Sequence, residues 1–256
     1  MTREKSSYAV QTVEKALDIL ETLTEEGRHA TLPYLAERLD LSRNKAFRLL
    51  ATLENKGLVE RDEASGIYRL GISSVELAQR LLNSTSIIRN AHPIMERLAR
   101  KHDESVYITV LKDDEVLFLD MVDCEQAIKT APLVGKRLPF FTNAAGKAIK
   151  ALEPTELLEK FFKKRSRMPG MPDPATLQSE LKTVREKGVA VDCNGLGEGI
   201  TTVAVAVRDY AGKVIGAITM LGPSFRMAAT RLEEEIIPSL REGAEMLSLK
   251  FGYAKL

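Results

Sequence analysis

The side chains best suited to bind a polyanionic partner lie in one segment, residues 42–48, which reads SRNKAFR. An arginine can donate two hydrogen bonds to the edge of guanine, and an asparagine can bond adenine in the same way. Serine and lysine side chains commonly contact phosphate oxygens. Residues 42–56 hold four basic side chains against one acidic side chain, a local net charge of +3. These residue types at this density indicate a nucleic-acid contact.

A second candidate site begins at the sequence TNAAG, residues 142–146. If a helix starts here, its first backbone amides have no partner within the helix and can bind an anion, particularly a carboxylate. The small side chains of Ala144 and Ala145 would leave those amides uncovered. The alternative interpretation is a plain capped helix that packs on a sheet.

Other chemistry is weakly represented in the sequence. The run GLGEG at 195–199 precedes an expected strand instead of opening a helix, so it does not match the dinucleotide-binding fingerprint. Cys193 lies next to Asp192, but the three histidines stand at no metal-ligand spacing from it, which favours a simple thiol. We find no nucleophile elbow, triad pattern or phosphate loop. We therefore expect no catalytic residue, no metal and no cofactor.

Hydrophobic periodicity predicts the helices that position residues 42–48. One helix begins after Thr31, which can cap it, with Pro33 in its first turn. The next helix begins after Ser42, a second capping residue, and ends near Asn55. A first helix precedes both, and its apolar stripe consists of Val13, Ala16, Leu17, Leu20 and Leu23.

A hairpin follows these three helices. Gly57 lies where the end of a helix favours positive φ, and short strands are expected at 58–61 and 67–70. The order helix, helix, turn, helix, hairpin predicts a winged helix-turn-helix, in which the third helix presents its first half to the major groove. The alternative is that its charges are ordinary solvated groups, because such modules also mediate protein contacts. The expected DNA contacts are Ser42, Arg43, Asn44, Lys45 and Arg48, with Arg69 from the hairpin.

Two helices are expected after the hairpin. Ser73 and Glu76 can form a capping box that opens the first of them. The second is expected from about Ala91 to Lys101, with Pro93 in its first turn. The apolar stripe of Leu77, Leu81 and Ile88 is longer than one short connector can bury, which indicates a dimer.

The hydrophobic period changes at about residue 105, where apolar residues begin to alternate. Strands are predicted at 105–111, 115–122, 189–192, 200–208 and 213–221. Helices are predicted at 143–152, 154–162, 175–187 and 228–249. Several consecutive strands with helices between them imply a mostly antiparallel sheet with helical cover.

Composition sets the limits of the interpretation. The chain of 256 residues is 44% hydrophobic and 29% charged, which suits two modest globular domains. Its net charge is only +1, so any signal for DNA must come from the local placement of charge. Two cysteines and no long apolar run indicate a reducing compartment and no membrane span, so we expect a cytoplasmic protein.

Several ordered motifs over about 240 residues resemble the IclR family of bacterial regulators. The stretches AVQTVEKALDILETL and LPYLAERLDLSRNKAFRLLATLENKGLVERD are similar to the DNA-binding domain of that family. GKRLPFFTNAAGKAIKA and EKGVAVDCNGLGEGITTVAVAVRDYAGKVIGAITMLGP are similar to its effector domain. The resemblance implies a winged helix-turn-helix, a linker helix and a GAF-like ligand domain. It also implies dimers that pair into tetramers and effectors that are small organic or aromatic acids.

The resemblance also carries a set of effector-binding positions. Members that bind small acids use main chain at positions matching Ala144 and Ala145. Cysteine and serine stand in the family where this chain has Thr202 and Leu221, so we expect a less polar pocket. An ionised Asp192 would repel a ligand carboxylate, so we expect it to be protonated or to accept from a ligand hydroxyl or a neighbouring amide. The side chains that the resemblance assigns are Asp192, Thr202, Thr219 and Leu221.

The sequence therefore predicts an α+β protein with residues 1–72 as the DNA-binding domain, 73–89 as the linker helix and 90–256 as the effector domain. The expected partners are double-stranded operator DNA, a small-molecule effector and further copies in a homodimer or homotetramer. One alternative is an enzyme with an α/β catalytic domain and an N-terminal interaction module. Another is a sensor that acts through protein partners instead of DNA.

Overall fold

The computed structural model describes residues 10–25, 29–164 and 170–253. Contacts between Cα atoms divide the chain into two compact units, Met1–Ser84 and Thr85–Leu256. Each unit has its own hydrophobic core.

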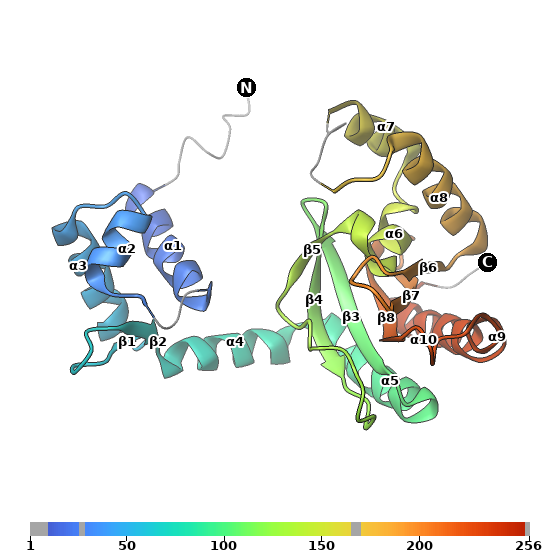
Figure 1. Cartoon of the computed structure of the whole chain (residues 1–256), viewed down its shortest axis with the longest axis horizontal. Coiled ribbons are helices and arrows are strands. Elements are labelled where there is room, and N and C mark those ends of the chain that lie inside the picture. Colours follow the sequence, from blue (N-terminus) through green and yellow to red (C-terminus); the bar gives the residue numbers. More distant parts are fainter. Residues whose placement is uncertain (1–9, 26–28, 165–169, 254–256) are drawn as a thin grey trace. The chain divides into compact units, whose positions relative to one another are not determined.

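The N-terminal unit has the predicted order of elements (Figure 1). The side chain of Ser42 caps the third helix by accepting a hydrogen bond from the amide of Lys45 at 3.2 Å. After that helix Gly57 adopts φ +68°, as expected for a residue that ends a helix. The elements are α1 (Gln11–Glu25), α2 (Leu32–Arg38), α3 (Arg43–Asn55), β1 (Val59–Arg61), β2 (Tyr68–Leu70) and α4 (Ile72–Ser84).

The buried face of α1 differs from the predicted stripe. Ile19 and Leu23 are buried in the core of the unit, whereas Val13 and Leu17 are 56% and 53% exposed. The helix is apolar on more than one face, and the periodicity alone did not show which face would pack against α3 and β2. The prediction for Val13 and Leu17 is therefore wrong, and the helix keeps an apolar exposed strip.

Two details of the following helices also differ from prediction. Because α4 already begins at Ile72, Ser73 lies inside the helix and does not cap it, and the hydroxyl of Ser74 donates to the carbonyl of Leu58 at 2.8 Å. The next helix, α5 (Ser86–His102), begins earlier than expected, so Pro93 lies in its interior. A proline there removes one helical hydrogen bond. The buried face of α5 packs on the sheet, which offsets that loss.

The C-terminal unit is built on a six-stranded sheet with the order β5-β4-β3-β8-β7-β6, and every neighbouring pair is antiparallel. The predicted antiparallel sheet is confirmed. β5 was not predicted because three residues are too few to show a period. The strands are β3 (Ser105–Lys112), β4 (Glu115–Val122), β5 (Arg137–Pro139), β6 (Ala190–Cys193), β7 (Ile200–Arg208) and β8 (Val214–Pro223).

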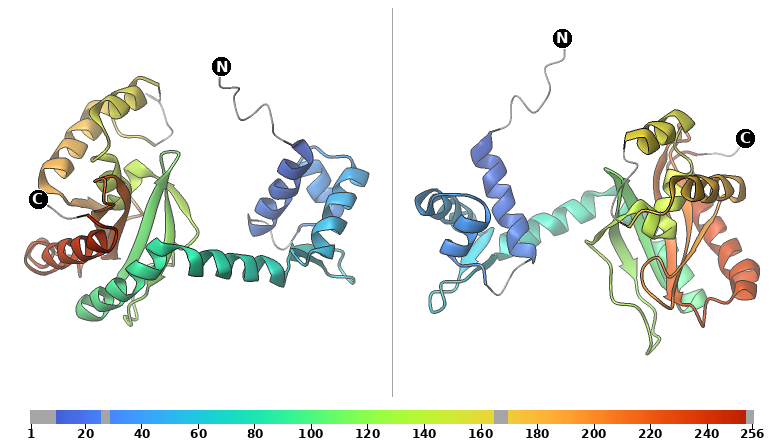
Figure 2. Two further views of the ribbon diagram at one scale, coloured as in Figure 1. Left: turned by 180° about the vertical axis from the view of Figure 1, so that it is seen from behind. Right: turned by 45° about the horizontal axis from the view of Figure 1, so that its top comes forward.

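Helices cover both faces of this sheet (Figures 1 and 2). Along β3, Val106 and Ile108 belong to the core beneath α5 and α10 (Ile237–Lys250), whereas Tyr107 belongs to the core on the opposite face. This alternation follows from the two-residue period of a strand. The opposite face is covered by η2 (Phe140–Thr142), α6 (Ala144–Lys150), α7 (Thr155–Lys164) and α8 (Pro174–Lys187), and the chain reaches α10 through α9 (Ala229–Arg231) and a π-helical turn, η3 (Leu232–Ile236).

Candidate DNA interface and effector site

The first half of α3 presents the side chains that the sequence assigned to DNA. Arg43, Asn44 and Arg48 are exposed, and Lys45 is half-buried. Among the described residues, no ion pair involves Arg43, Lys45 or Arg48. Ser42 is exposed, and its hydroxyl oxygen already caps the helix. The cationic groups on this surface are therefore free of competing carboxylates.

An exposed aromatic ring stands among these side chains. Phe47 is 51% exposed, one residue before Arg48 and three after Asn44. All three residues line a surface hollow of about 660 Å³ on α3. A large apolar ring on a charged helix can contact the methyl group of thymine. The sequence reasoning did not single out Phe47, although an aromatic at a solvent-facing helical position was visible in the pattern.

The hairpin residue Arg69 is in a different situation. It lies opposite Glu60 in the β1–β2 ladder, and its guanidinium pairs with that carboxylate at 3.2 Å. Both side chains are exposed, so the pair is weak and a phosphate can compete for Arg69. The structure thus gives Arg69 a local partner that the α3 residues do not have.

The six predicted effector residues converge on one face of the C-terminal sheet. In the register of the sheet, Asp192 lies opposite Thr202, and Thr202 lies opposite Leu221. Thr219 lies two residues before Leu221 on β8 and faces the same side. Ala144 and Ala145 begin α6, which covers this face, and both belong to one core cluster with Leu221.

The first turn of α6 is already hydrogen-bonded. The amide of Ala144 donates to the hydroxyl of Thr202 at 3.1 Å, and the amide of Gly146 donates to the side chain of Asn143 at 2.9 Å. Neither of these two side chains caps the amide of Ala145. A carboxylate that binds the Ala144 amide must therefore displace Thr202 or share the bond with it.

The structure adds a lysine that the sequence reasoning missed. Lys147, one turn into α6, pairs with Asp192 inside the unit and lies 3.0 Å from the carboxylate of Glu180 on α8. Burial lowers the pKa of Lys147, but the hydrogen bonds and charges of Asp192 and Glu180 outweigh burial and hold its pKa above the ordinary value. The second oxygen of Asp192 accepts from the amide of Gly195 at 2.9 Å. Asp192 therefore has a cation and a neighbouring amide as partners.

These groups are enclosed. Thr202, Thr219 and Leu221 are each 1% exposed, and Ala144 and Ala145 are fully buried. Because a buried hydroxyl or amide is costly unless it is bonded, such a set can hold a small polar ligand firmly and exclude water from it.

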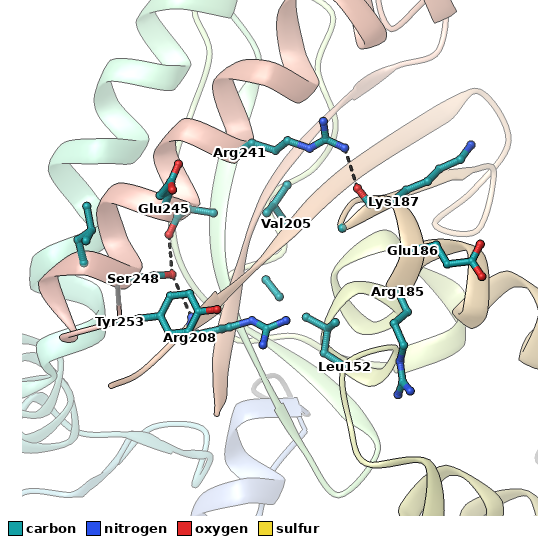
Figure 3. Close-up of a pocket in the computed structure, with 14 residues that line it drawn as sticks. Leu152, Arg185, Glu186, Lys187, Val205, Arg208, Arg241, Glu245, Ser248 and Tyr253 are labelled. Carbon is teal, nitrogen blue, oxygen red and sulfur yellow. Dashed lines mark hydrogen bonds between the residues drawn. The ribbon is translucent and has the colours of Figure 1, made fainter. Parts of the chain in front are cut away.

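A separate cavity lies elsewhere in the same unit. It measures about 560 Å³ and lies between the end of α8, β7 and α10 (Figure 3). At its rim Arg241 donates to the carbonyl of Lys187 at 2.7 Å, and the amide of Arg208 donates to Ser248 at 3.0 Å. Its lining includes none of the six predicted effector residues. Its size alone therefore does not make it the effector site.

The described helices include none that is both long and apolar enough to span a lipid bilayer.

A winged helix-turn-helix with an accessible recognition helix, followed by a separate α/β unit with an enclosed polar site, defines a DNA-binding transcriptional regulator with a sensor domain. Residues 79–249 match the family model described as the C-terminal domain of the bacterial transcriptional regulator IclR, and residues 12–63 match the IclR helix-turn-helix domain. The chain belongs to the IclR family of bacterial transcriptional regulators.

The similar proteins extend over the whole chain. The HTH-type transcriptional regulator KdgR of Escherichia coli is 29% identical over 98% of this chain and 96% of its own length. An IclR transcriptional regulator from Alicyclobacillus acidocaldarius has a TM-score of 0.84 at 25% identity, covering 96% of this chain and all of that chain. An IclR homologue from Microbacterium hydrocarbonoxydans, solved with 4-hydroxybenzoate, has a TM-score of 0.78 at 26% identity, and the match covers 94% of this chain and 98% of that chain. The names describe regulators, so they favour this class over the enzyme alternative.

Proposed function

We propose that α3 reads operator DNA in the major groove and that a small organic acid, bound between α6 and the sheet, changes the affinity for that DNA. The observation that carries the DNA half is the exposed, carboxylate-free set of Arg43, Asn44 and Arg48 on the first turns of a capped helix. Arginine and asparagine can read guanine and adenine, and Lys45 and Ser42 can position the helix on phosphates. The Arg69 guanidinium would contact the DNA backbone once its ion pair with Glu60 is broken.

The effector half rests on the enclosed groups around α6. The start of a helix favours an anion, and the amides of Ala144 and Ala145 lie there. Lys147 adds a positive charge one turn later, although Asp192 neutralises it in this structure. Thr202 and Thr219 supply hydroxyls, and Leu221 supplies an apolar wall. The complex of the Microbacterium homologue with 4-hydroxybenzoate supports an acid as the ligand class.

We propose that two or four copies assemble, with residues 1–72 as the DNA-binding part, 73–89 as the linker and 90–256 as the effector part. One helix-turn-helix contacts only half of a typical operator, so specific binding needs at least two. Leu77 and Leu81 on α4 are more than half exposed, as are Val13 and Leu17 on α1, which supports burial of these strips between copies. Since the target is chromosomal DNA, we place the protein in the cytoplasm.

The decisive test is fluorescence anisotropy with the full chain and the intergenic DNA beside its own gene. We expect salt-dependent binding that is weakened by about 1–3 kcal/mol in Arg43→Ala and unchanged in the control Arg100→Ala, an arginine whose side chain is 80% exposed on α5. Addition of acids from a panel of aliphatic and aromatic carboxylates is expected to change the affinity by about 5- to 150-fold. Equal losses in both variants would argue against reading by α3, and no binding to any DNA would favour a sensor that acts through protein partners.

A further inference from the structure

Phe47 lies outside the face by which α3 packs on its own unit. The apolar residues around it in the helix, Ala46, Leu49 and Leu50, are buried in the N-terminal unit, whereas Phe47 is 51% exposed. Among the described residues, its ring makes no contact with another aromatic ring and no cation–π contact. A single exposed apolar side chain is common on protein surfaces, so a role for Phe47 depends on its neighbours.

Those neighbours are the side chains that carry the proposed base contacts. Asn44 precedes Phe47 by three positions, and Ala51 follows it by four. Residues three and four positions apart on a helix lie on one face, with Cβ atoms about 5–6 Å apart. Arg48 lines the same surface hollow as these three residues. One face of α3 therefore carries an amide, an apolar ring and a guanidinium, and the small Ala51 lets this face approach a groove closely.

An A·T base pair offers complementary groups to an amide and an apolar ring. In the major groove adenine presents N7 and its amino group, which an asparagine can bond together, and thymine presents a C5 methyl group. Successive base pairs lie about 3.4 Å apart, so the 5–6 Å between Asn44 and Phe47 corresponds to fewer than two base-pair steps. The two side chains can therefore contact base pairs that are the same or close neighbours.

We propose that Phe47 is a specificity-determining residue, whose ring covers the C5 methyl group of a thymine within two base pairs of the adenine bound by Asn44. The inference rests on the proposed reading of DNA by α3 and adds the base required at one position of each half-site. Cytosine at that position carries no methyl group, so less apolar surface leaves water on binding and the affinity is lower.

The test removes single methyl groups from the DNA. The wild-type full chain first selects its tightest duplex from a random-sequence pool, and each thymine of that duplex is then replaced in turn by deoxyuridine, which lacks only the methyl group. Fluorescence anisotropy should show that one replacement in each half-site weakens binding by about fourfold, as expected for exposing one methyl-sized group. In Phe47→Ala the same replacement should change the Kd by less than about 1.5-fold, because the group that covers the methyl is gone.

Tyr210→Ala is the matched control, because Tyr210 is an aromatic residue that is 82% exposed in the other unit. This variant should keep the fourfold effect. The melting temperature of Phe47→Ala should stay close to that of the wild type, since the ring lies outside the core cluster of its unit.

The possible results separate Phe47 from the proposal on which it depends. If no thymine replacement weakens binding, or if the effect persists in Phe47→Ala, Phe47 does not read thymine, and a loss of affinity in Arg43→Ala still supports reading by α3. If Phe47→Ala keeps the methyl effect and lowers the mass measured by light scattering, the ring belongs to a contact between copies instead. If the wild type selects no sequence from the pool, the proposed reading of DNA fails and the role of Phe47 fails with it.

Discussion

Replacing Lys147 with methionine should destabilise the C-terminal unit more than any other single charge removal on the face beneath α6. The side chains of Lys147 and Asp192 are only 11% and 8% exposed, so the substitution leaves a buried carboxylate without its cation. Removing one partner of a buried pair typically costs about 3–5 kcal/mol. Asp192→Asn should cost less, about 1.5–3 kcal/mol, because Lys147 keeps Glu180 at 3.0 Å and one charged hydrogen bond is lost.

The double variant Lys147→Met with Asp192→Asn measures the interaction free energy between the two side chains. Since the two groups act on each other, the double variant should lose about 1–3 kcal/mol less than the sum of the single losses. The assay is urea unfolding followed by circular dichroism at one fixed protein concentration, because assembly changes apparent stability. Arg100→Met, which removes an exposed pair at 4.0 Å, should cost less than about 1 kcal/mol. Additive losses, or a Lys147→Met variant as stable as the wild type, would refute this account.

The same pair sets a dependence of stability on pH. The pKa of Lys147 is raised in the folded state, so the folded chain holds this proton more tightly than the unfolded chain. The contribution of this ion pair to stability is therefore fully present below the ordinary lysine pKa of 10.5 and is lost as the pH rises through the higher pKa of the folded state. Wild type should lose stability above about pH 10.5 more steeply than Lys147→Met, as measured by urea unfolding between pH 8 and 11.

Three further predictions concern DNA, ligand choice and assembly. Arg43→Ala should cost about 1–3 kcal/mol of operator affinity and relax specificity at one base pair. Lys45→Ala should instead weaken binding to all sequences and reduce the slope of affinity against salt concentration by about one unit. Anisotropy titrations over a range of salt concentrations and operator variants distinguish the two outcomes. Leu221→Ser should shift preference toward smaller, more polar acids by about 1–3 kcal/mol in calorimetry, and an unchanged ranking of acids would remove Leu221 from the pocket. Leu77→Glu with Leu81→Glu should shift the mass from light scattering toward the monomer and weaken operator binding, and an unchanged mass would place the assembly surface elsewhere.

Local signals made the DNA-binding unit predictable to within a residue or two. Ser42 marks the start of α3 and Gly57 marks its end, and both act through short-range capping interactions that can be predicted from the residue types alone. The orientation of α1 could not be predicted in the same way. A helix with apolar residues on several faces buries the face that neighbouring elements cover. In α1 this is the face of Ile19, so Leu17 stays exposed.

For the candidate effector site, the sequence predicted only a set of positions. From the sequence, Asp192 was expected to repel a ligand carboxylate, because its partner Lys147 lies 45 residues away in the chain. The packing of α6 on β6 brings the two side chains together. A lysine in a short helix is normally solvated, so no periodicity marks it as buried.

All seven residues of α6 are buried, and the proposed acid site lies beneath them. If an acid binds at the Ala145 amide, the helices α6, α7 and α8 that pack over this face must first move aside. Effector association should accordingly have two kinetic regimes: an observed rate that rises with ligand concentration when ligand is scarce, and a plateau equal to the opening rate when ligand is abundant. The response time of the regulator is then set by the motion of its own cover, and a pulse of acid shorter than that opening time leaves the operator complex unchanged.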